Sequence, residues 1–344
     1  MKIYLDAMGG DFAPKAPVEG ALEALTNYSD LIIELAGPLA EVQPVVEEVF
    51  QGNEALKERL VLTDCPEVIT NCESPVMAVR HKKQSAIVDG MLKLRDGQVD
   101  AFVSAGSTGA VLAGGMFRLG RIPGIDRPAL APLLPNGKDF FLLIDCGANV
   151  DCKPEYLHQF AQMGNAYMQT MRNIATPRIG LVNNGAEAEK GCTLTKETFQ
   201  LLQADGKLNF VGNVEAREIT HDVADVIVCD GFVGNVILKF MEGVVETLMD
   251  MIKGEIYADT RSKIGGLLAK PAFKRVKKKT DYTEVGGAPL LGVRGNVVKA
   301  HGSSNGHALA CAIRQAIQMT EGELVRKIEN QLVSAETETV SEQI

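Results

Sequence analysis

Short apolar runs alternate with longer helical stretches along most of the chain. The runs are rich in Val, Ile, Leu and Phe and are too short for helices, so each predicts a buried strand. The predicted strands are residues 2–5, 32–36, 60–62, 101–103, 140–145, 179–182, 209–211, 226–229 and 296–300. The predicted helices include residues 16–25, 74–95, 153–172, 196–204 and 308–316. This alternation predicts an α/β fold of three layers, in which a mainly parallel sheet carries helices on both faces.

The alternation stops after residue 235. There the pattern becomes a long helix, a break at Gly265-Gly266 and a second helix rich in Lys and Arg. We therefore expect residues 236–285 to form a helical hairpin that protrudes from a single α/β domain of residues 1–344. The end of the chain, residues 334–344, is acidic, and we expect it to fray.

Four predicted strands run into loops made of glycine and polar residues. The loops are residues 6–11, 104–109, 230–235 and 301–306. Glycine lets the backbone turn sharply and approach a ligand closely. Because ligands of open α/β sheets bind beyond the carboxyl ends of the strands, we expect these loops to converge on one crevice.

Composition limits the class of protein. Hydrophobic residues make up 46% of the 344 residues, and the mean hydropathy is near zero, as expected for a chain with a substantial core. No run of about 18 apolar residues occurs, so the sequence predicts no membrane span. A strand that begins at residue 2 leaves no room for a signal peptide, and the seven cysteines form no C-x-x-C pair. These features predict a cytoplasmic protein with reduced thiols and no zinc site.

The net charge of −9 is unevenly distributed. Residues 253–279 hold nine Lys or Arg and only two acidic residues, which usually indicates an anionic partner. Nucleic acid is a poor candidate, because the chain has no recognised binding motif and only 5% aromatic residues. Apolar residues among the cations predict that this segment lies on an anionic membrane surface, docks an acidic protein, or packs as a solvated helix in a dimer. The residues expected to dock are Leu267, Leu268, Lys270, Phe273, Lys274, Arg275 and Lys277.

Two short motifs suggest other chemistry. Residues 302–306 match the G-x-S-x-G nucleophile elbow, but that triad needs an acid and then a histidine further along the chain. The only later histidine, His307, lies one helical turn away, so we interpret this loop as an anion site formed by hydroxyls and helix N–H groups. His221 and Asp225 fit an H-x-x-x-D pattern, but Asp225 begins an apolar strand, and a surface turn is the better interpretation. Neither G-x-G-x-x-G nor G-x-x-x-x-G-K-[ST] occurs, which disfavours nicotinamide and ATP sites.

Longer sequence words carry a resemblance to a known family. In chain order they are DAMGGD, SAGSTGA, GRIPGIDRPALAP, DCGANVDCKPE, GNVEAR, DGFVGNVILK, GGAPLLG and HGSSN. Together, over about residues 1–317, they resemble the bacterial phosphate acyltransferases, the acyl carrier protein:phosphate transacylases of membrane phospholipid synthesis. Ser107 stands where that family usually has Asn, and Phe12 stands where His is common. The resemblance implies a fold related to those of phosphate acetyltransferases and isopropylmalate dehydrogenases.

The resemblance also implies an activity and its partners. A homodimer would move a fatty acyl group from the thioester of acyl carrier protein to inorganic phosphate, with no cofactor. It would associate peripherally with the membrane, meeting the membrane surface or a membrane-embedded glycerol-phosphate acyltransferase. Two rivals remain: an oxidoreductase of the isopropylmalate dehydrogenase type, and a lipid-binding module without enzyme activity. The missing dinucleotide loop disfavours the first, and the polar loops at strand ends disfavour the second.

Acyl transfer to phosphate needs hydrogen-bond donors near the developing oxyanion and a cation near the phosphate. This chemistry and the resemblance assign the catalytic roles to Lys190, in a loop after a predicted strand, and to Asn235, at the start of a helix. The expected substrate-binding residues are Asp6, Gly9, Gly10, Asp11, Ser107, Asn149, Glu187, Asp230, Gly231, Gly234, His301, Ser303, Ser304 and Asn305. We interpret the aspartates in this set as groups that orient Lys190 and the loop hydroxyls, with a metal ion held by them as the alternative.

Overall fold

The strands lie in two sheets. The computed structural model describes the backbone of residues 1–280 and 285–341 and the side chains of residues 1–276 and 285–332. Within these residues, the first sheet has seven strands in the order β3-β2-β1-β4-β12-β11-β5, and the second has five in the order β6-β7-β10-β8-β9. The first consists of β1 (Lys2–Asp6), β2 (Ile32–Gly37), β3 (Leu60–Asp64), β4 (Ala101–Ser104), β5 (Ala129–Leu130), β11 (Ala288–Leu291) and β12 (Asn296–Lys299). The second consists of β6 (Leu133–Pro135), β7 (Phe140–Ile144), β8 (Arg178–Asn183), β9 (Asn209–Glu215) and β10 (Val226–Val228).

Most neighbouring strands run parallel. The strands β3, β2, β1, β4 and β12 are parallel, as are β7, β10, β8 and β9. The antiparallel pairs are β12 with β11, β11 with β5, and β6 with β7. The prediction of a mainly parallel α/β fold is confirmed. Its division into two sheets was not predicted, because the apolar pattern locates strands but does not say which of them pair.

One predicted strand, residues 209–211, is too short. Here β9 continues through Gly212, close to a register shift in the pairing of β8 with β9 between Ile179 and Gly180. Gly212 has a positive φ of 100°, which favours glycine. The glycine interrupts the apolar run in the sequence without ending the strand.

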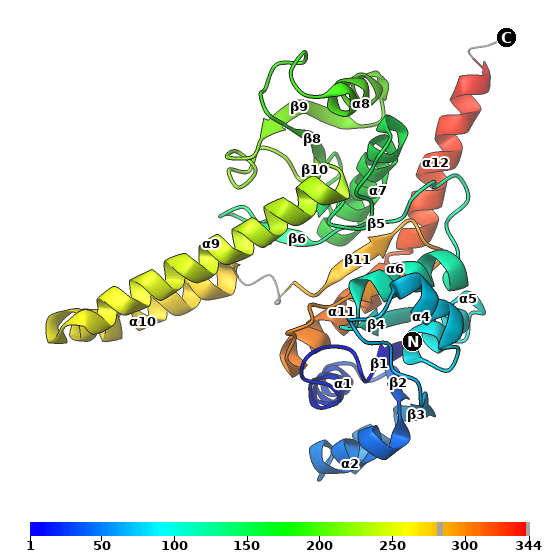
Figure 1. Cartoon of the computed structure of the whole chain (residues 1–344), viewed down its shortest axis with the longest axis vertical. Coiled ribbons are helices and arrows are strands. Elements are labelled where there is room, and N and C mark those ends of the chain that lie inside the picture. Colours follow the sequence, from blue (N-terminus) through cyan, green and yellow to red (C-terminus); the bar gives the residue numbers. More distant parts are fainter. Residues whose placement is uncertain (281–284, 342–344) are drawn as a thin grey trace.

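Helices cover the sheets and extend from them (Figure 1). They are α1 (Lys15–Asn27), α2 (Leu39–Val49), α3 (Glu54–Lys57), α4 (Pro75–His81), α5 (Ala86–Arg95), α6 (Thr108–Gly114), the π-helix η1 (Gly115–Leu119), α7 (Pro154–Arg172), α8 (Thr193–Ala204), α9 (Gly231–Ala258), α10 (Thr260–Thr280), α11 (Gly306–Glu321) and α12 (Leu324–Ser341).

Alternate residues of the strands enter different cores. Ile3 and Leu5 of β1 share a core with α1 and α11, whereas Tyr4 shares one with α5 and α6. In the second sheet, Leu142 of β7 packs in the core that contains α7, and Phe141 packs with the first turns of α9. This is the period-two pattern of strands buried on both faces, so the expected three layers are present in each half.

The prediction of one helix over residues 74–95 is wrong, because the chain turns between α4 and α5. The backbone N–H of Gln84 donates to Glu67 Oε2 at 2.8 Å, and Ser85 Oγ donates to the carbonyl of Lys82 at 2.8 Å. Such local bonds give the backbone an alternative to helical hydrogen bonds, and the apolar pattern does not reveal them.

The expected helical hairpin is confirmed as α9 and α10, which project side by side from the body (Figure 1). The predicted break at Gly265-Gly266 is wrong, because the turn is at Asp259. The Asp259 carboxylate accepts the backbone N–H of Ser262 at 2.9 Å and its hydroxyl at 2.6 Å, which caps the start of α10. Gly266 lies inside α10, where a Cβ would come within 2.4 Å of Ile256 Cγ2. This glycine therefore lets the two helices pack closely instead of separating them.

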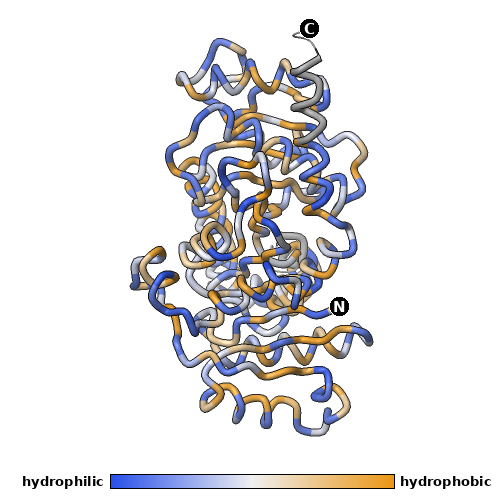
Figure 2. Tube along the Cα trace, turned by 90° about the vertical axis from the view of Figure 1, so that its right-hand side faces the viewer, coloured by the Kyte–Doolittle hydropathy of each residue, from blue (hydrophilic) through white to orange (hydrophobic). Residues whose placement is uncertain are grey.

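Exposed apolar side chains run along the hairpin. Leu267 and Leu268 are 69% and 79% exposed. Figure 2 shows hydrophobic and hydrophilic positions interleaved along the chain as a whole. Further exposed apolar residues of the hairpin are Phe240, Leu248, Met251, Tyr257, Ile264 and Val276. Among the other predicted docking residues, Phe273 is half-buried, Lys270, Lys274 and Arg275 are exposed, and the side chain of Lys277 lies outside the described part of the structure. Exposed apolar residues gathered on one element are typical of association surfaces.

Helix α12 carries the chain to Ser341. The expected frayed tail of residues 334–344 lies outside the described side chains, and residues 342–344 lie outside the described backbone. The organisation of residues 1–344 as a single domain stays a prediction. In the described part of the chain, none of the helices has both the length and the apolar character needed to cross a membrane.

Candidate active site

Three of the four polar loops meet at the carboxyl ends of β1, β4 and β12, which are neighbours in the first sheet. The N–H of Asp11 donates to the carbonyl of Gly302 at 2.8 Å. A Cβ on Gly9 would come within 2.5 Å of the backbone nitrogen of Gly106, and Gly10 has a φ of 97°. Only glycine permits this close approach of the three loops.

The fourth loop follows β10 in the second sheet and begins α9. Asp230 caps this helix, since its Oδ1 accepts an N–H of the first turn at 2.8 Å. The N–H of Gly231 donates to the carbonyl of Asn149 at 2.7 Å, and a Cβ on Gly234 would lie 1.9 Å from the carbonyl oxygen of Asp145. The first turn of α9 therefore rests directly on the backbone of the loop that follows β7.

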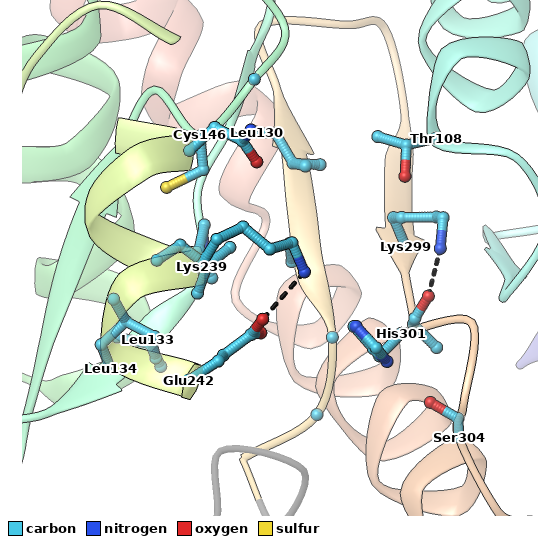
Figure 3. Close-up of a pocket in the computed structure, with 18 of the residues that line it drawn as sticks. Thr108, Leu130, Leu133, Leu134, Cys146, Lys239, Glu242, Lys299, His301 and Ser304 are labelled. Atoms are coloured by element: carbon cyan, nitrogen blue, oxygen red, sulfur yellow. Dashed lines mark hydrogen bonds and ion pairs between the residues drawn. The ribbon is translucent and has the colours of Figure 1, made fainter. Parts of the chain in front are cut away.

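A pocket of about 340 Å³ lies between the two sheets (Figure 3). It is lined by Thr108, Gly109, Leu112, Leu130, Pro132, Leu133, Leu134, Cys146, Gly147, Asn235, Leu238, Lys239, Glu242, Val285, Gly286, Gly287, Ala288, Lys299, Ala300, His301 and Ser304. The expectation of a shared crevice is confirmed for the loops of residues 104–109, 230–235 and 301–306, which all contribute to this lining. The loop of residues 6–11 packs behind it.

Polar groups enter the pocket from both sides. On the α9 side, Lys239 Nζ forms an ion pair with Glu242 Oε2 at 2.8 Å, and Asn235 lies one turn closer to the start of the helix. Lys299 and His301 face them from β12 and the loop that follows it (Figure 3). The two sheets thus present hydrogen-bond donors to the same space.

The α9 side of the pocket also carries an apolar wall. Leu130, Leu133 and Leu134 are buried beside it, and Leu238 of α9 is half-buried (Figure 3). A pocket with one apolar wall and a few convergent polar groups can hold a hydrocarbon chain and orient a polar head.

Lys299 is one of the polar lining residues that the sequence analysis missed, together with Thr108, Lys239 and Glu242. Its Nζ donates to the carbonyl of Ala105 at 3.3 Å and to the carbonyl of Ala300. Burial lowers the pKa of this ammonium to about 8, although the charge of Asp6 acts in the opposite direction. A single lysine inside the apolar run of residues 296–300 was the signal that could have identified it.

His301 is held by the loop to which it belongs. Its Nδ1 lies 2.7 Å from Ser303 Oγ and accepts the backbone N–H of Ser303 at 3.2 Å. Burial lowers the pKa of the imidazole, so the ring is neutral at pH 7. Because Nδ1 is an acceptor, Nε2 carries the proton of the neutral ring and can donate to a ligand.

Asp6 lies below the three loops of the first sheet rather than in the pocket. Its carboxylate accepts Ser104 Oγ at 2.7 Å and the N–H of Met8 at 3.0 Å. Burial raises the pKa of this carboxyl, and the two hydrogen bonds oppose the shift. Asp6 therefore orients a loop hydroxyl, as predicted for the aspartates of this set.

Asp145 was not predicted, although it opens the DCGANVD word. Its carboxylate accepts the N–H groups of Leu130 at 2.9 Å and Asn149 at 2.7 Å, and the amide of Asn149 at 2.9 Å. Burial raises the pKa of Asp145 to about 6 against these bonds. The Asn149 amide also donates to the carbonyl of Pro128 at 2.8 Å, so Asn149 fixes the floor under α9 and does not line the pocket.

Two other predicted binding residues cap helices. Ser107 Oγ accepts the N–H of Ala110 at 3.4 Å at the start of α6, and Asn305 Oδ1 accepts the N–H of Ala308 at 2.9 Å at the start of α11. In this structure their side-chain oxygens shape the loops that carry Thr108 and Ser304 into the pocket.

Lys190 and Glu187 lie in the loop after β8, the strand next to β10 in the second sheet. Both side chains are exposed, and neither lines the pocket. The loop is tied down through its backbone, because Asn183 Nδ2 donates to the carbonyl of Lys190 at 3.1 Å and Asn213 Nδ2 donates to that of Glu187 at 2.9 Å. The catalytic role of Lys190 and the substrate-binding role of Glu187 stay predictions.

The H-x-x-x-D motif is not part of this site. Asp225 Oδ2 accepts the backbone N–H of Arg178 at 2.7 Å and its Nε at 3.1 Å, and His221 is exposed. The surface-turn interpretation therefore agrees with the structure.

Two acids of the loops, Asp6 and Asp230, accept hydrogen bonds from N–H and O–H donors. In the part of the chain that the structure describes, no three His, Cys, Asp or Glu side chains gather closely enough to form a metal site. Asp6 and Asp230 therefore act as hydrogen-bond acceptors in this structure.

The chain is similar to proteins of a known family. A family model described as "Fatty acid synthesis protein" matches residues 1–327. The chain is 48% identical to the phosphate acyltransferase of Clostridium novyi over 96% of this chain and 98% of that protein. It is 50% identical to the phosphate acyltransferase of Alkaliphilus oremlandii over 95% of this chain and 96% of that protein.

Solved structures with the same fold are more distant in sequence. A phosphotransacetylase from Streptococcus pyogenes superposes with a TM-score of 0.59 at 15% identity, covering 95% of this chain and 94% of that chain. A phosphotransacetylase from Staphylococcus aureus gives a TM-score of 0.57 at 15% identity and the same coverage. These likenesses confirm the predicted relation to the phosphate acetyltransferase fold.

Proposed function

This chain belongs to the phosphate acyltransferase family, and we propose that it transfers a fatty acyl group from the thioester of acyl carrier protein to inorganic phosphate. The product is an acyl phosphate for phospholipid synthesis. The observation that carries this proposal is the pocket between the two sheets, which combines an apolar wall with converging hydrogen-bond donors. The apolar wall suits an acyl chain, and the hydrogen-bond donors suit a thioester carbonyl and phosphate.

The reaction makes one bond and breaks one. A phosphate oxygen attacks the thioester carbonyl carbon, the carbonyl oxygen becomes an oxyanion, and collapse of this tetrahedral intermediate expels the thiolate, which takes up a proton. Phosphate is already substantially ionised near pH 7, so it needs positioning more than deprotonation. Asn235 donates its amide to the oxyanion from α9, and Lys190 supplies positive charge from the neighbouring loop. The apolar wall of the pocket limits the access of water to the acyl phosphate.

The donor can be tested by comparing thioesters of one acyl chain. Phosphate-dependent release of thiol is expected to be much faster from the thioester of acyl carrier protein than from that of coenzyme A. Equal rates with both donors would contradict the choice of the carrier protein and leave the family activity intact.

EDTA is expected to leave most of the activity in place. The acids near the pocket already accept N–H and O–H groups, as shown by Asp6 with Ser104 and Asp230 with the first turn of α9. Turnover is measured after dialysis against EDTA, with dialysis against buffer as the control. A complete loss that one divalent metal restores would show that the acids hold a metal ion.

We further propose that the hairpin of α9 and α10 docks on an anionic membrane surface, with acyl carrier protein as the alternative occupant. Its exposed leucines suit the apolar part of a membrane surface, and its basic residues suit the anionic headgroups. Other exposed apolar residues of the hairpin can pack against a second copy of the chain, which supports a homodimer.

Replacing Leu267 and Leu268 by glutamine is expected to weaken binding to anionic liposomes by about 10²- to 10⁴-fold, because each buried leucine contributes roughly 1.5–3 kcal/mol. Turnover with a soluble donor should survive. The matched control replaces Val76 and Met77, an exposed apolar pair on α4 that is 51% and 48% exposed, and should leave liposome sedimentation unchanged. Unchanged binding by the leucine variant contradicts membrane docking, and a collapse of turnover with acyl carrier protein identifies the carrier as the occupant.

A further inference from the structure

Lys299 is a buried cation with spare hydrogen-bonding capacity. The residue is only 7% exposed, and its Nζ donates to two backbone carbonyls, those of Ala105 and Ala300. An ammonium has three N–H donors, so these two acceptors leave one for a ligand. Asp6 and Asp11 lie near enough to favour its charge, but among the described residues neither carboxylate forms an ion pair with it.

Lys93 is another partly buried lysine, and its charge is neutralised by two carboxylates. Lys93 Nζ contacts Glu34 Oε1 at 2.5 Å and Asp89 Oδ2 at 2.9 Å. Burying a charge without a partner is costly, so a buried lysine that lacks such carboxylates is expected to have a ligand that supplies the negative charge.

The position of Lys299 indicates which ligand this is. The residue lines the pocket together with Thr108 and Ser304, which come from two different loops (Figure 3). Two hydroxyls and an ammonium suit a small tetrahedral oxyanion. Ser304 also lies just before the 16-residue helix α11, whose N-terminus adds positive potential.

We propose that Lys299 binds the phosphate that accepts the acyl group, in an anion subsite completed by the hydroxyls of Thr108 and Ser304. The identity of the anion rests on the proposed function, whereas the need for an anion rests on the buried lysine. The phosphate then lies on the β12 side of the pocket and faces Asn235 and the apolar wall on the α9 side. The thioester carbonyl is held between them.

The subsite has a characteristic pH dependence. Burial lowers the pKa of Lys299 to about 8, so the ammonium is charged below this pH and loses its charge as the pH rises through it. The charged groups that face it are Asp6, Asp11 and Lys239, and the nearby His301 is already neutral in this range. Phosphate affinity is therefore expected to fall between about pH 7.5 and pH 9.5.

Calorimetric titration of the full chain with inorganic phosphate, in the absence of any thioester, tests the subsite. Lys299→Met is expected to weaken phosphate binding by about 10- to 100-fold. Lys138→Met, which removes the charge of an exposed lysine outside the pocket, should bind like the wild type. Lys299→Arg keeps its charge above pH 9 and should remove the loss of affinity with rising pH.

Wild-type affinity in a folded Lys299→Met variant would overturn the proposal. If that variant does not fold, the pH profiles decide: a fall of affinity that persists in Lys299→Arg belongs to another group and contradicts the role of Lys299. Phosphate binding with the expected Lys299 dependence, in a protein that makes no acyl phosphate, would support the subsite and refute the proposed function. No phosphate binding by the wild type would refute the subsite.

Discussion

Replacing Asn235 by alanine is expected to lower the rate of acyl transfer to phosphate by about 10²–10³-fold, or roughly 3–4 kcal/mol of transition-state stabilisation. The residue lines the pocket from the second turn of α9, and its side chain packs beside Gly147, where a Cβ would lie 3.7 Å from Asn235 Oδ1. An amide in this position can donate to an oxyanion that forms in the pocket. Steady-state kinetics with acyl carrier protein thioester and phosphate measures the effect.

Asn235→Asp is the matched variant. It keeps the shape of the side chain but replaces the donor by a carboxylate that repels an oxyanion, so it should be as slow as Asn235→Ala. The melting temperature of both variants should stay close to that of the wild type, because the side chain is exposed to the pocket. Two folded variants that turn over within about threefold of the wild-type rate would remove Asn235 from the mechanism.

The role of Lys190 is tested by the same assay. Lys190→Ala is expected to lower turnover by at least about 10²-fold, and Lys190→Arg should rescue it poorly, because a planar guanidinium does not replace a compact ammonium. His221→Ala should be close to the wild type, since this residue is exposed beside the Arg178–Asp225 pair. Loss of activity in His221→Ala, with Lys190→Ala within about threefold of the wild type, would indicate a histidine base instead.

Gly234→Ala is expected to destabilise the protein by about 1–3 kcal/mol and to lower turnover along with it. A Cβ at this position would lie 1.9 Å from the carbonyl oxygen of Asp145, and neither group is the flexible end of a side chain. The first turn of α9 must therefore move, and Asn235 moves with it. Thermal melting and turnover are measured on the same preparation.

The control for this variant lies on the same helix. Gly243 is also in α9, but a Cβ there would meet nothing within 4 Å. Gly243→Ala should therefore leave turnover unchanged and keep or raise the stability by up to about 1 kcal/mol, because alanine favours the helix. If Gly234→Ala behaves like Gly243→Ala, the contact between α9 and the Asp145 loop does not position Asn235.

The sequence predicted much of this arrangement because its signals were local. A strand, a glycine turn and a helix follow one another directly at residues 6–11, 230–235 and 301–306, and strand ends in parallel sheets share one edge. That reasoning correctly brought Asn235, His301 and Ser304 to one pocket. It also identified the hairpin, because the change from short runs to long helices is visible without knowledge of the fold.

The rest depended on contacts between distant parts of the chain. Apart from its place in an apolar run, nothing in the local sequence distinguishes Lys299 from an exposed lysine. Its burial depends on contacts with the ends of β4 and β12, where the carbonyls of Ala105 and Ala300 accept its N–H groups. The buried carboxylate of Asp145 accepts local N–H groups of Asn149 and also the N–H of Leu130, which belongs to another strand and which the sequence pattern does not reveal. In the same way, Gly266 marked a close contact between helices and not a break, since the contact is with Ile256 on α9.

The measurement that tests the central claim most directly is the fate of labelled phosphate. The purified chain is incubated with the thioester of acyl carrier protein and radiolabelled inorganic phosphate, and the released thiol is counted in parallel. Attack by phosphate on the thioester predicts a labelled, acid-labile acyl phosphate that forms in equal amount with the thiol and is nearly lost in Asn235→Ala. Thiol release without any labelled product, at a rate that does not depend on phosphate, would contradict acyl transfer to phosphate.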